Sequence, residues 1–317
     1  MRSAPLMQYG ITVFGNHQTT TALVESLVVD GLKPDLIVTL GQGARQKVTI
    51  AGAANDLADW SRVNGVALYE CEGYRLISER DRAFFDDNTF GIGVCTDWQH
   101  LIPGHVLDRF DQGIFGFHGS LMEFPNGRGR SPFNWSIRLG GKSIFHNCFR
   151  YTERADDGGV FNTTEISIAP DDTIRMLQFK AVIDSRVTIR RLLQAYLAGS
   201  IPLTPQPESA SVWLPKLTPE DSRLQFEATG MRAILNLIRA SSPPFSGAYG
   251  LTADGTRVTI WRAVAYEGPI DPQWAQAPVG SVVAVALDTV LIKCRNGMLL
   301  ATEVSSEAEI VPGLRLA

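Results

Sequence analysis

Strand-like and helix-like segments alternate along the first half of the chain, and this alternation limits the folds open to it. Short apolar runs typical of buried strands are separated by stretches of helical length. Strands that are separated by helices pair in parallel and form βαβ units. The strand-like runs span residues 9–15, 34–40, 66–70, 90–95 and 113–120, and the first two helical stretches span 21–32 and 53–63. We therefore predict an α/β domain with a parallel sheet.

The remainder of this domain follows a different pattern. Residues 131–141 read as a helix with Ser131 as its N-cap and Pro132 in the first turn. Two strand-like runs then flank the polar turn Arg-Ala-Asp-Asp-Gly-Gly, and residues 171–199 have the apolar spacing of one long helix. We expect this helix to complete a first domain over residues 1–200.

A segment rich in Pro and Ser begins after residue 200 and lacks apolar periodicity. It predicts an extended linker over 201–220 that follows the surface. A second domain, 221–317, begins with a helix at 227–240 and continues with strand-like runs separated by turn residues, which suggests a small antiparallel β-barrel. These four runs are residues 256–266, 280–287, 289–294 and 298–306.

Charge excludes some partners and leaves others open. Lys and Arg number 29 against 33 Asp and Glu, so the net charge is −4 and no overall positive field favours nucleic acid. A small anion held by two or three arginines remains allowed. Apolar runs such as residues 22–29 are interrupted by charge and fall short of the ~20 residues of a membrane span.

The first eight residues carry no apolar signal region, so we expect a cytoplasmic protein. Four cysteines, Cys71, Cys95, Cys148 and Cys294, show neither C-x-x-C spacing nor clustering with histidine. This favours reduced, buried thiols over a metal site or a disulfide framework.

The strongest local feature is the segment of residues 113–135, in which a buried strand ends close to His118. Ligands bind beside the carboxyl ends of strands in open α/β sheets. Strand periodicity places Gly116, His118 and Ser120 on one face. The alternative is a histidine that is only hydrogen-bonded at a strand end. Ser120 lacks the G-x-S-x-G setting of a serine nucleophile.

Two polar loops could complete a site around His118. Asp156 and Asp157 precede two glycines, a pattern usual for exposed turns, but a carboxylate beside a histidine would favour its charged form. The loop before Ser131 contains Arg128 and Arg130 and could bind a phosphate, or be an ordinary basic loop.

Taken together, His-Gly-Ser-Leu, Arg-Gly-Arg-Ser-Pro-Phe-Asn-Trp and Arg-Ala-Asp-Asp-Gly-Gly-Val resemble the signature of the 10-formyltetrahydrofolate-dependent formyltransferases. The most similar branch is the nucleotide-sugar N-formyltransferases, including the domain that formylates UDP-4-amino-4-deoxy-L-arabinose. The likeness extends from about residue 9 to 305. It implies a Rossmann-like catalytic domain, an OB-like open β-barrel after it, and 10-formyltetrahydrofolate as co-substrate.

The resemblance also implies roles for individual residues. His118 and Asp156 match the catalytic histidine and aspartate, so His118 would take a proton from the amine or polarise the formyl oxygen. Arg128 and Arg130 would face the anionic part of the substrate, and His17 would touch the sugar. The folate pocket would be lined by four residues that follow the strand at 90–95, namely Trp98, His100, Leu101 and Ile102.

One position departs from the family. Gly116 stands where the family has an asparagine that donates to the oxyanion formed during transfer. We treat the Asn position as vacant, with three outcomes open. A water or a neighbour (Gln99, His100 or Asn134) could replace the donor; the space could admit a larger substrate or another acyl donor; or the protein could bind folate or a nucleotide sugar without catalysis.

We therefore predict an N-formyltransferase that acts on a nucleotide-linked amino sugar. Two other substrates remain open, a hydroxyornithine-type amine and methionyl-tRNA, although the negative charge weighs against tRNA. The second domain could form a homodimer surface, a second substrate site or simple packing.

Overall fold

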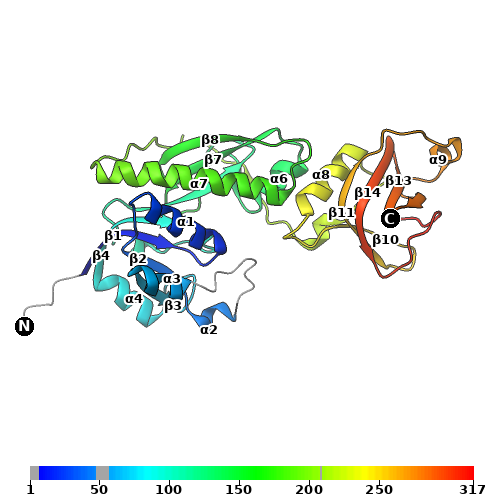
Figure 1. Cartoon of the computed structure of the whole chain (residues 1–317). Helices are drawn as coiled ribbons and strands as arrows, with labels where there is room; N and C mark the ends of the chain where they lie inside the picture. Colours follow the sequence, from blue (N-terminus) through cyan, green and yellow to red (C-terminus); the bar gives the residue numbers. More distant parts are fainter. Residues whose placement is uncertain (1–6, 48–56, 208) are drawn as a thin grey trace, which may run out of the picture.

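The computed structural model describes residues 7–47, 57–207 and 209–317. Residues 53–56 of the second helical stretch and the leader residues 1–6 lie outside them. Within the described residues the two larger sheets have seven and five strands, a third sheet pairs two short strands, and the chain runs from the seven-stranded to the five-stranded sheet (Figure 1). None of the helices in these ranges is long and apolar enough to cross a bilayer.

The first sheet confirms the predicted parallel arrangement. Its strand order is β3-β2-β1-β4-β5-β7-β8, with parallel pairing from β3 to β5 and antiparallel pairing of β7 and β8. The order reverses between β1 and β4, and such a switch point opens a crevice at the carboxyl ends of the strands. The strands are β1 (Met7–Phe14), β2 (Leu36–Leu40), β3 (Ala67–Cys71), β4 (Asn88–Cys95), β5 (Ile114–Ser120), β7 (Ser143–Arg150) and β8 (Val160–Ser167).

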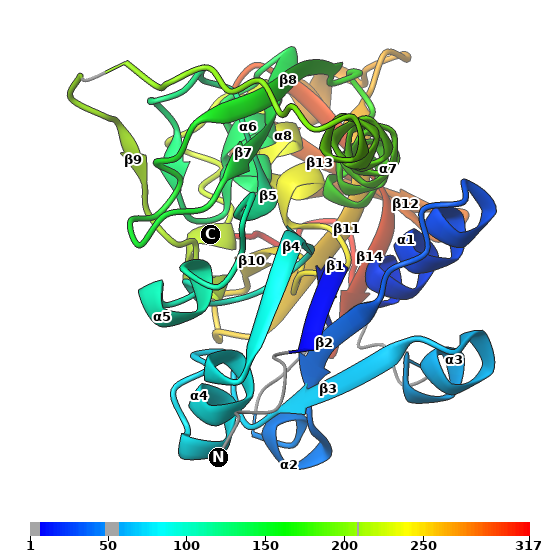
Figure 2. The ribbon, with the colours of Figure 1, turned by 90° about the vertical axis from the view of Figure 1, so that its left-hand side faces the viewer.

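Helices cover both faces of this sheet (Figures 1 and 2). On one face Leu23, Leu57 and Leu192 pack against the strand residues Val13 and Val94, and on the other Phe85 and Val106 pack against Phe14. Both cores are dry aliphatic and aromatic clusters, which hold the strands rigidly under the site. The helices are α1 (Gln18–Val29), α2 (Gln42–Arg45), α3 (Leu57–Asn64), α4 (Glu79–Asp86), α5 (Gly104–Leu107), α6 (Pro132–Arg138) and α7 (Ile174–Leu197).

Two helix starts show how the local sequence works. The Thr173 side chain accepts the Met176 N–H and begins α7, as capping threonines do. Helix α6 begins at Pro132 as predicted, but Ser131 does not cap it with its side chain. Ser131 has a φ of 52°, and its Oγ instead accepts the Leu217 N–H at 3.3 Å.

The second sheet is antiparallel, in the order β10-β11-β14-β13-β12. Its first strand, β10, was missed because its four residues include Gly250 and carry little alternation. Helix α8 (Met231–Ser241) packs Ile234 and Ile238 onto this sheet, and Asn134 of α6 donates to the Ala240 carbonyl of α8 at 2.8 Å. The remaining elements are β10 (Ala248–Leu251), β11 (Arg257–Ala265), α9 (Pro272–Gln276), β12 (Val282–Ala286), β13 (Thr289–Cys294) and β14 (Gly297–Ser306).

The connecting segment, residues 201–220, pairs with the first domain along its length. Thr204 forms a bridge with Val160, and the short strand β9 (Trp213–Leu214) pairs in parallel with β6 (Arg128–Gly129). Further on, a 3₁₀ turn covers Pro219–Ser222. The segment is therefore extended, and its pairings fix it to β8 and to the loop that contains Arg128.

Gly91, in the middle of β4, tests how tightly the sheet is covered by α7. A Cβ at this position would lie 2.1 Å from the Tyr196 hydroxyl and 2.6 Å from the Gly10 carbonyl oxygen. We expect Gly91→Ala to lower the free energy of unfolding by about 1–3 kcal/mol, as overpacking does. Gly43→Ala is the control, because nothing lies within 4 Å of the position that its added Cβ would take. Urea unfolding measures both; equal stability of the two variants would contradict the packing.

Candidate active site

Strand β5 carries His118 to the carboxyl edge of the sheet, with its side chain 8% exposed. Nε2 lies 2.7 Å from the Gly127 carbonyl oxygen, and Nδ1 lies 3.5 Å from Asp156 Oδ2. A carbonyl oxygen only accepts, so Nε2 carries a proton. In the neutral ring the lone pair is then on Nδ1, facing the carboxylate, where it can accept a proton.

The turn between β7 and β8 places Asp156. Its φ is 55°, a left-handed conformation that aspartate tolerates, and its Oδ2 accepts the Gly129 N–H at 3.3 Å. The turn passes so close to β7 that a Cβ at Gly158 would lie 1.6 Å from the Arg150 carbonyl oxygen. The structure thus brings together His118 and Asp156, the pair expected from the sequence.

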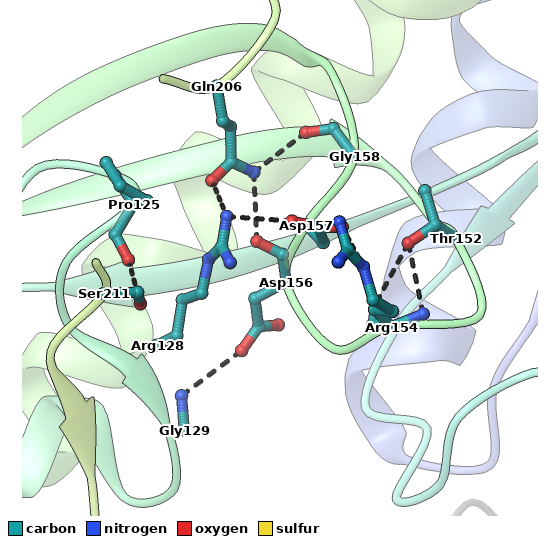
Figure 3. Close-up of polar contacts among 10 residues, drawn as sticks. All are labelled: Pro125, Arg128, Gly129, Thr152, Arg154, Asp156, Asp157, Gly158, Gln206 and Ser211. Carbon is teal, nitrogen blue, oxygen red and sulfur yellow. Dashed lines mark hydrogen bonds and ion pairs between the residues drawn. The ribbon is translucent and has the colours of Figure 1, made fainter. Parts of the chain in front are cut away.

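Asp157 belongs to a neighbouring ionic network (Figure 3). It pairs with Arg128 at 3.2 Å and with the more exposed Arg154. Arg128 is 8% exposed and also donates to Gln206 Oε1 at 2.5 Å, while its buried Nε has no partner among the described residues. The two adjacent aspartates therefore have different partners: Asp156 faces a histidine, and Asp157 pairs with arginines.

Gln206, from the connecting segment, was missed by the sequence analysis. Its Nε2 donates to the carbonyls of Asp156 and Gly158, at 2.9 and 2.8 Å, while its Oε1 accepts from Arg128 (Figure 3). This one amide thus joins the aspartate turn to the arginine loop. A lone glutamine between prolines carries no periodicity or motif that would have revealed the role.

The glycine-rich loop does not present free amides to a phosphate. Gly127 N–H donates to Val212, Gly129 N–H to Asp156 and Arg130 N–H to Leu214. Only Arg128 of its two arginines enters the ionic network, whereas Arg130 is exposed. These backbone amides therefore hold the loop against Asp156 and the connecting segment.

The space beside Gly116 is occupied by the side chain of Tyr151, a neighbour that was not among those considered from the sequence. A Cβ there would lie 1.9 Å from Oη of Tyr151 and 2.3 Å from its Cζ. Of the neighbours considered as substitutes, Asn134 is committed to α8, whereas Gln99 and His100 are exposed. Tyr151, the residue after β7, occupies the space beside Gly116 because a glycine leaves room for its ring.

The residues expected to line a folate pocket have mixed environments. Trp98 is half-buried, donates to the Tyr74 carbonyl at 2.9 Å and packs edge-on against its ring. His100 and Leu101 are exposed. Ile102 is only 2% exposed and belongs to the core under the sheet, so it presents no surface to a ligand.

His17 is the N-cap residue of α1, directly after β1. It therefore lies at the same edge of the sheet as the segment after β4, since both follow neighbouring parallel strands.

A cleft of about 740 Å³ opens beside the ionic network. Three arginines (Arg128, Arg150 and Arg154) and one acidic residue, Asp157, line it. The connecting segment contributes Pro205, Gln206, Pro207 and Ala210. Three guanidinium groups against one carboxylate leave net positive charge, which suits an anionic ligand. Among the described residues no group of His, Cys, Asp and Glu is placed to hold a metal ion.

Comparison with known proteins identifies the class. Residues 68–184 match the domain described as formyl transferase, and residues 216–311 match the formyl transferase C-terminal domain. The chain belongs to the formyl transferase family and contains both of its domains.

Solved structures show the same fold at low identity. WlaRD, a sugar 3N-formyl transferase studied with dTDP and 5-N-formyl-THF, is 14% identical with a TM-score of 0.64, covering 96% of this chain and 100% of that one. The N-formyltransferase of Helicobacter canadensis, in complex with folinic acid and dTDP-3-aminofucose, is 12% identical with a TM-score of 0.63, covering 93% and 99%.

HypX from Aquifex aeolicus, in complex with tetrahydrofolic acid, is 16% identical with a TM-score of 0.62. The alignment covers 95% of this chain but only 44% of HypX, so the chain spans less than half of that protein. The shared architecture therefore occurs both as a separate protein and as part of a longer one.

The buried pair of Arg128 and Asp157 should contribute to stability. Asp157→Asn keeps the shape but removes the charge beside a guanidinium that is 90% buried, so we expect a loss of about 1.5–3 kcal/mol. Asp59→Asn breaks the exposed pair with Arg62 and should leave stability unchanged. Thermal and urea unfolding of both variants provide the measurement; an unaffected Asp157→Asn protein would argue against the network.

Proposed function

We propose that this formyltransferase moves the formyl group of 10-formyltetrahydrofolate to the primary amine of a nucleotide-linked amino sugar. The observation that carries the proposal is the His118–Asp156 pair at the carboxyl edge of the sheet, beside a cleft lined by arginines. Family membership supplies the reaction class. The sugar N-formyltransferases of similar fold are only 12% and 14% identical to this chain, so the amino-sugar substrate is our proposal.

Formyl transfer needs a base, because the amine nitrogen becomes positively charged when it bonds to the formyl carbon and must then lose a proton. Nδ1 of His118 is the free acceptor, since the Gly127 carbonyl holds the proton on Nε2. Once Nδ1 is protonated, Asp156 at 3.5 Å stabilises the imidazolium. His118 then returns the proton to the departing folate nitrogen, so one residue serves as base and acid.

The surface after β4 suits the flat ring of the folate. The exposed Leu101 and His100 and the half-buried Trp98 present apolar and aromatic area, and backbone groups of this segment offer polar contacts. His17 lies at the same edge and would face the sugar. The co-substrate supplies only the formyl group; the protein supplies position and proton transfer.

The arginine-lined cleft suits the diphosphate of a nucleotide sugar. Arg150 ends β7, and Arg154 lies in the following turn, which also contains Asp156. A phosphate bound between them would therefore place the sugar near His118. Its volume of about 740 Å³ lies within the usual range for small-molecule sites. A cytoplasmic location agrees with four buried and unpaired thiols.

His118→Ala should abolish transfer while the protein still binds the folate. The matched control is His146→Ala, which removes a second buried histidine paired with an aspartate, Asp184, at 2.7 Å on the α7 side of β7. Its loss should reduce stability but leave kcat per folded molecule close to wild type. Single-turnover formyl transfer measures both, and comparable rates for wild type and His118→Ala would remove His118 from the mechanism.

The substrate class is tested by calorimetry with UDP-, dTDP- and GDP-linked amino sugars in the presence of a folate analogue. We expect Arg154→Gln to weaken binding by roughly tenfold, the loss of one charge-assisted contact. Arg130→Gln, outside the lining of the cleft, tests the sequence-based assignment. Absence of nucleotide-sugar binding, with transfer to another amine, would overturn the proposed substrate and keep the reaction class.

A further inference from the structure

Position 116 lies two residues before His118 on the same face of β5. The resemblance to the formyltransferases implies an amide donor at this position. In this chain the ring of Tyr151 covers it. Any side chain at 116 would collide with this ring, whose Oη, Cζ and Cε1 all lie within 2.6 Å of the Cβ position. The glycine and the tyrosine are therefore a matched pair: each is accommodated because of the other.

Strand pairing brings Tyr151 to the same face as His118. Tyr151 follows the last residue of β7 and donates its N–H to the Ile114 carbonyl at 2.7 Å, so it lies opposite the start of β5. Side chains at positions 114, 116 and 118 share one face of β5. A series of ring contacts connects the two groups. Tyr151 contacts Phe149, Phe149 packs edge-on against Phe124, and Phe124 stacks on His118 with ring centroids 5.6 Å apart.

The Tyr151 hydroxyl remains a proton donor. Burial, and the nearby Cys95 and Asp156, raise the pKa of this phenol well above its ordinary value, so it stays neutral at physiological pH. In the described part of the chain its hydrogen-bond partner is the Cys95 thiol, a weak one. Buried tyrosine hydroxyls usually bond a stronger acceptor. An oxyanion would be such an acceptor.

We propose that Tyr151 is the oxyanion donor of this enzyme and replaces the asparagine absent at Gly116. The inference rests on the proposed formyl transfer. As the amine nitrogen bonds to the formyl carbon, the carbonyl π electrons move to the formyl oxygen, which accepts a hydrogen bond from Tyr151 Oη. No proton leaves the phenol. When the C=O bond re-forms, the bond from carbon to the folate nitrogen breaks, and that nitrogen takes its proton from His118.

The test is Tyr151→Phe, which keeps the ring over Gly116 and removes only the donor. We expect kcat to fall about 10²–10³-fold, the usual effect of losing one oxyanion donor. The KM values of both substrates should stay within about threefold, because the contact strengthens only in the transition state. The loss should be the same from pH 6 to 9 because the phenol does not ionise there.

Tyr196→Phe is the matched control. The Tyr196 hydroxyl covers Gly91 in the same way, at 2.1 Å from its Cβ position, but among the core residues of the α7 face. Its kcat should equal that of wild type. Melting temperatures of both variants show whether folding is affected, and loss of kcat in the two variants alike would overturn the specific role of Tyr151.

A double variant separates the donor from simple packing. Gly116→Asn alone should lose both stability and activity because Tyr151 blocks the position. Combining it with Tyr151→Ala restores the space and the family's amide, and we expect kcat to exceed that of Tyr151→Ala by at least about tenfold. Provided that the wild type transfers formyl groups, two results would overturn the role of Tyr151 and leave the proposed function standing. One is a double variant no faster than Tyr151→Ala, and the other is full activity of Tyr151→Phe. A wild type that transfers no formyl group overturns the proposed function and this inference together.

Discussion

The antiparallel pairing of β5 with β7 is the contact on which the site depends. It places His118 opposite Asn147 and Gly116 opposite Phe149. The chain then leaves β7 at a point from which Asp156 can face the His118 imidazole. Parallel strands alone could not do this, because their connections cross over a face of the sheet and do not turn back beside the same edge. The end of β7 and the turn that follows it, residues 150–159, therefore combine the aspartate, the two outer arginines and the tyrosine in one short stretch.

The connecting segment adds the second wall. A chain between two domains is often only a spacer, but here Gln206 bonds to both the arginine loop and the aspartate turn, and β9 pairs with β6. The bonds from Gln206 to the aspartate turn and the pairing of β9 with β6 are made to backbone groups, so they restrain both loops whatever the side chains there do. The bond from Gln206 to the arginine loop is made to the Arg128 side chain.

The exchange of an amide for a phenol at position 116 shows why a motif cannot be interpreted one residue at a time. The glycine alone indicates a lost donor, since nothing near it in sequence replaces the asparagine. The replacement comes from a residue 35 positions later that strand register brings alongside. Tyr151 carries no signal of its own, because a tyrosine after a strand is ordinarily a packing residue.

The sequence by itself determined the parallel sheet, the long helix and the second antiparallel unit, because periodicity and turn residues are local properties. The roles expected of His118 and Asp156 followed only from the resemblance to a known family, and their contact is seen only in the structure. Missed features include the strand β10, too short to alternate, and the burial of Ile102. Only the tertiary structure decided that Arg128 turns to Asp157 and Gln206, that the glycine-rich loop has committed its amides, and that Tyr151 fills the space at Gly116. These depend on which distant backbone groups meet, and strand register and loop packing set that only after the chain has folded.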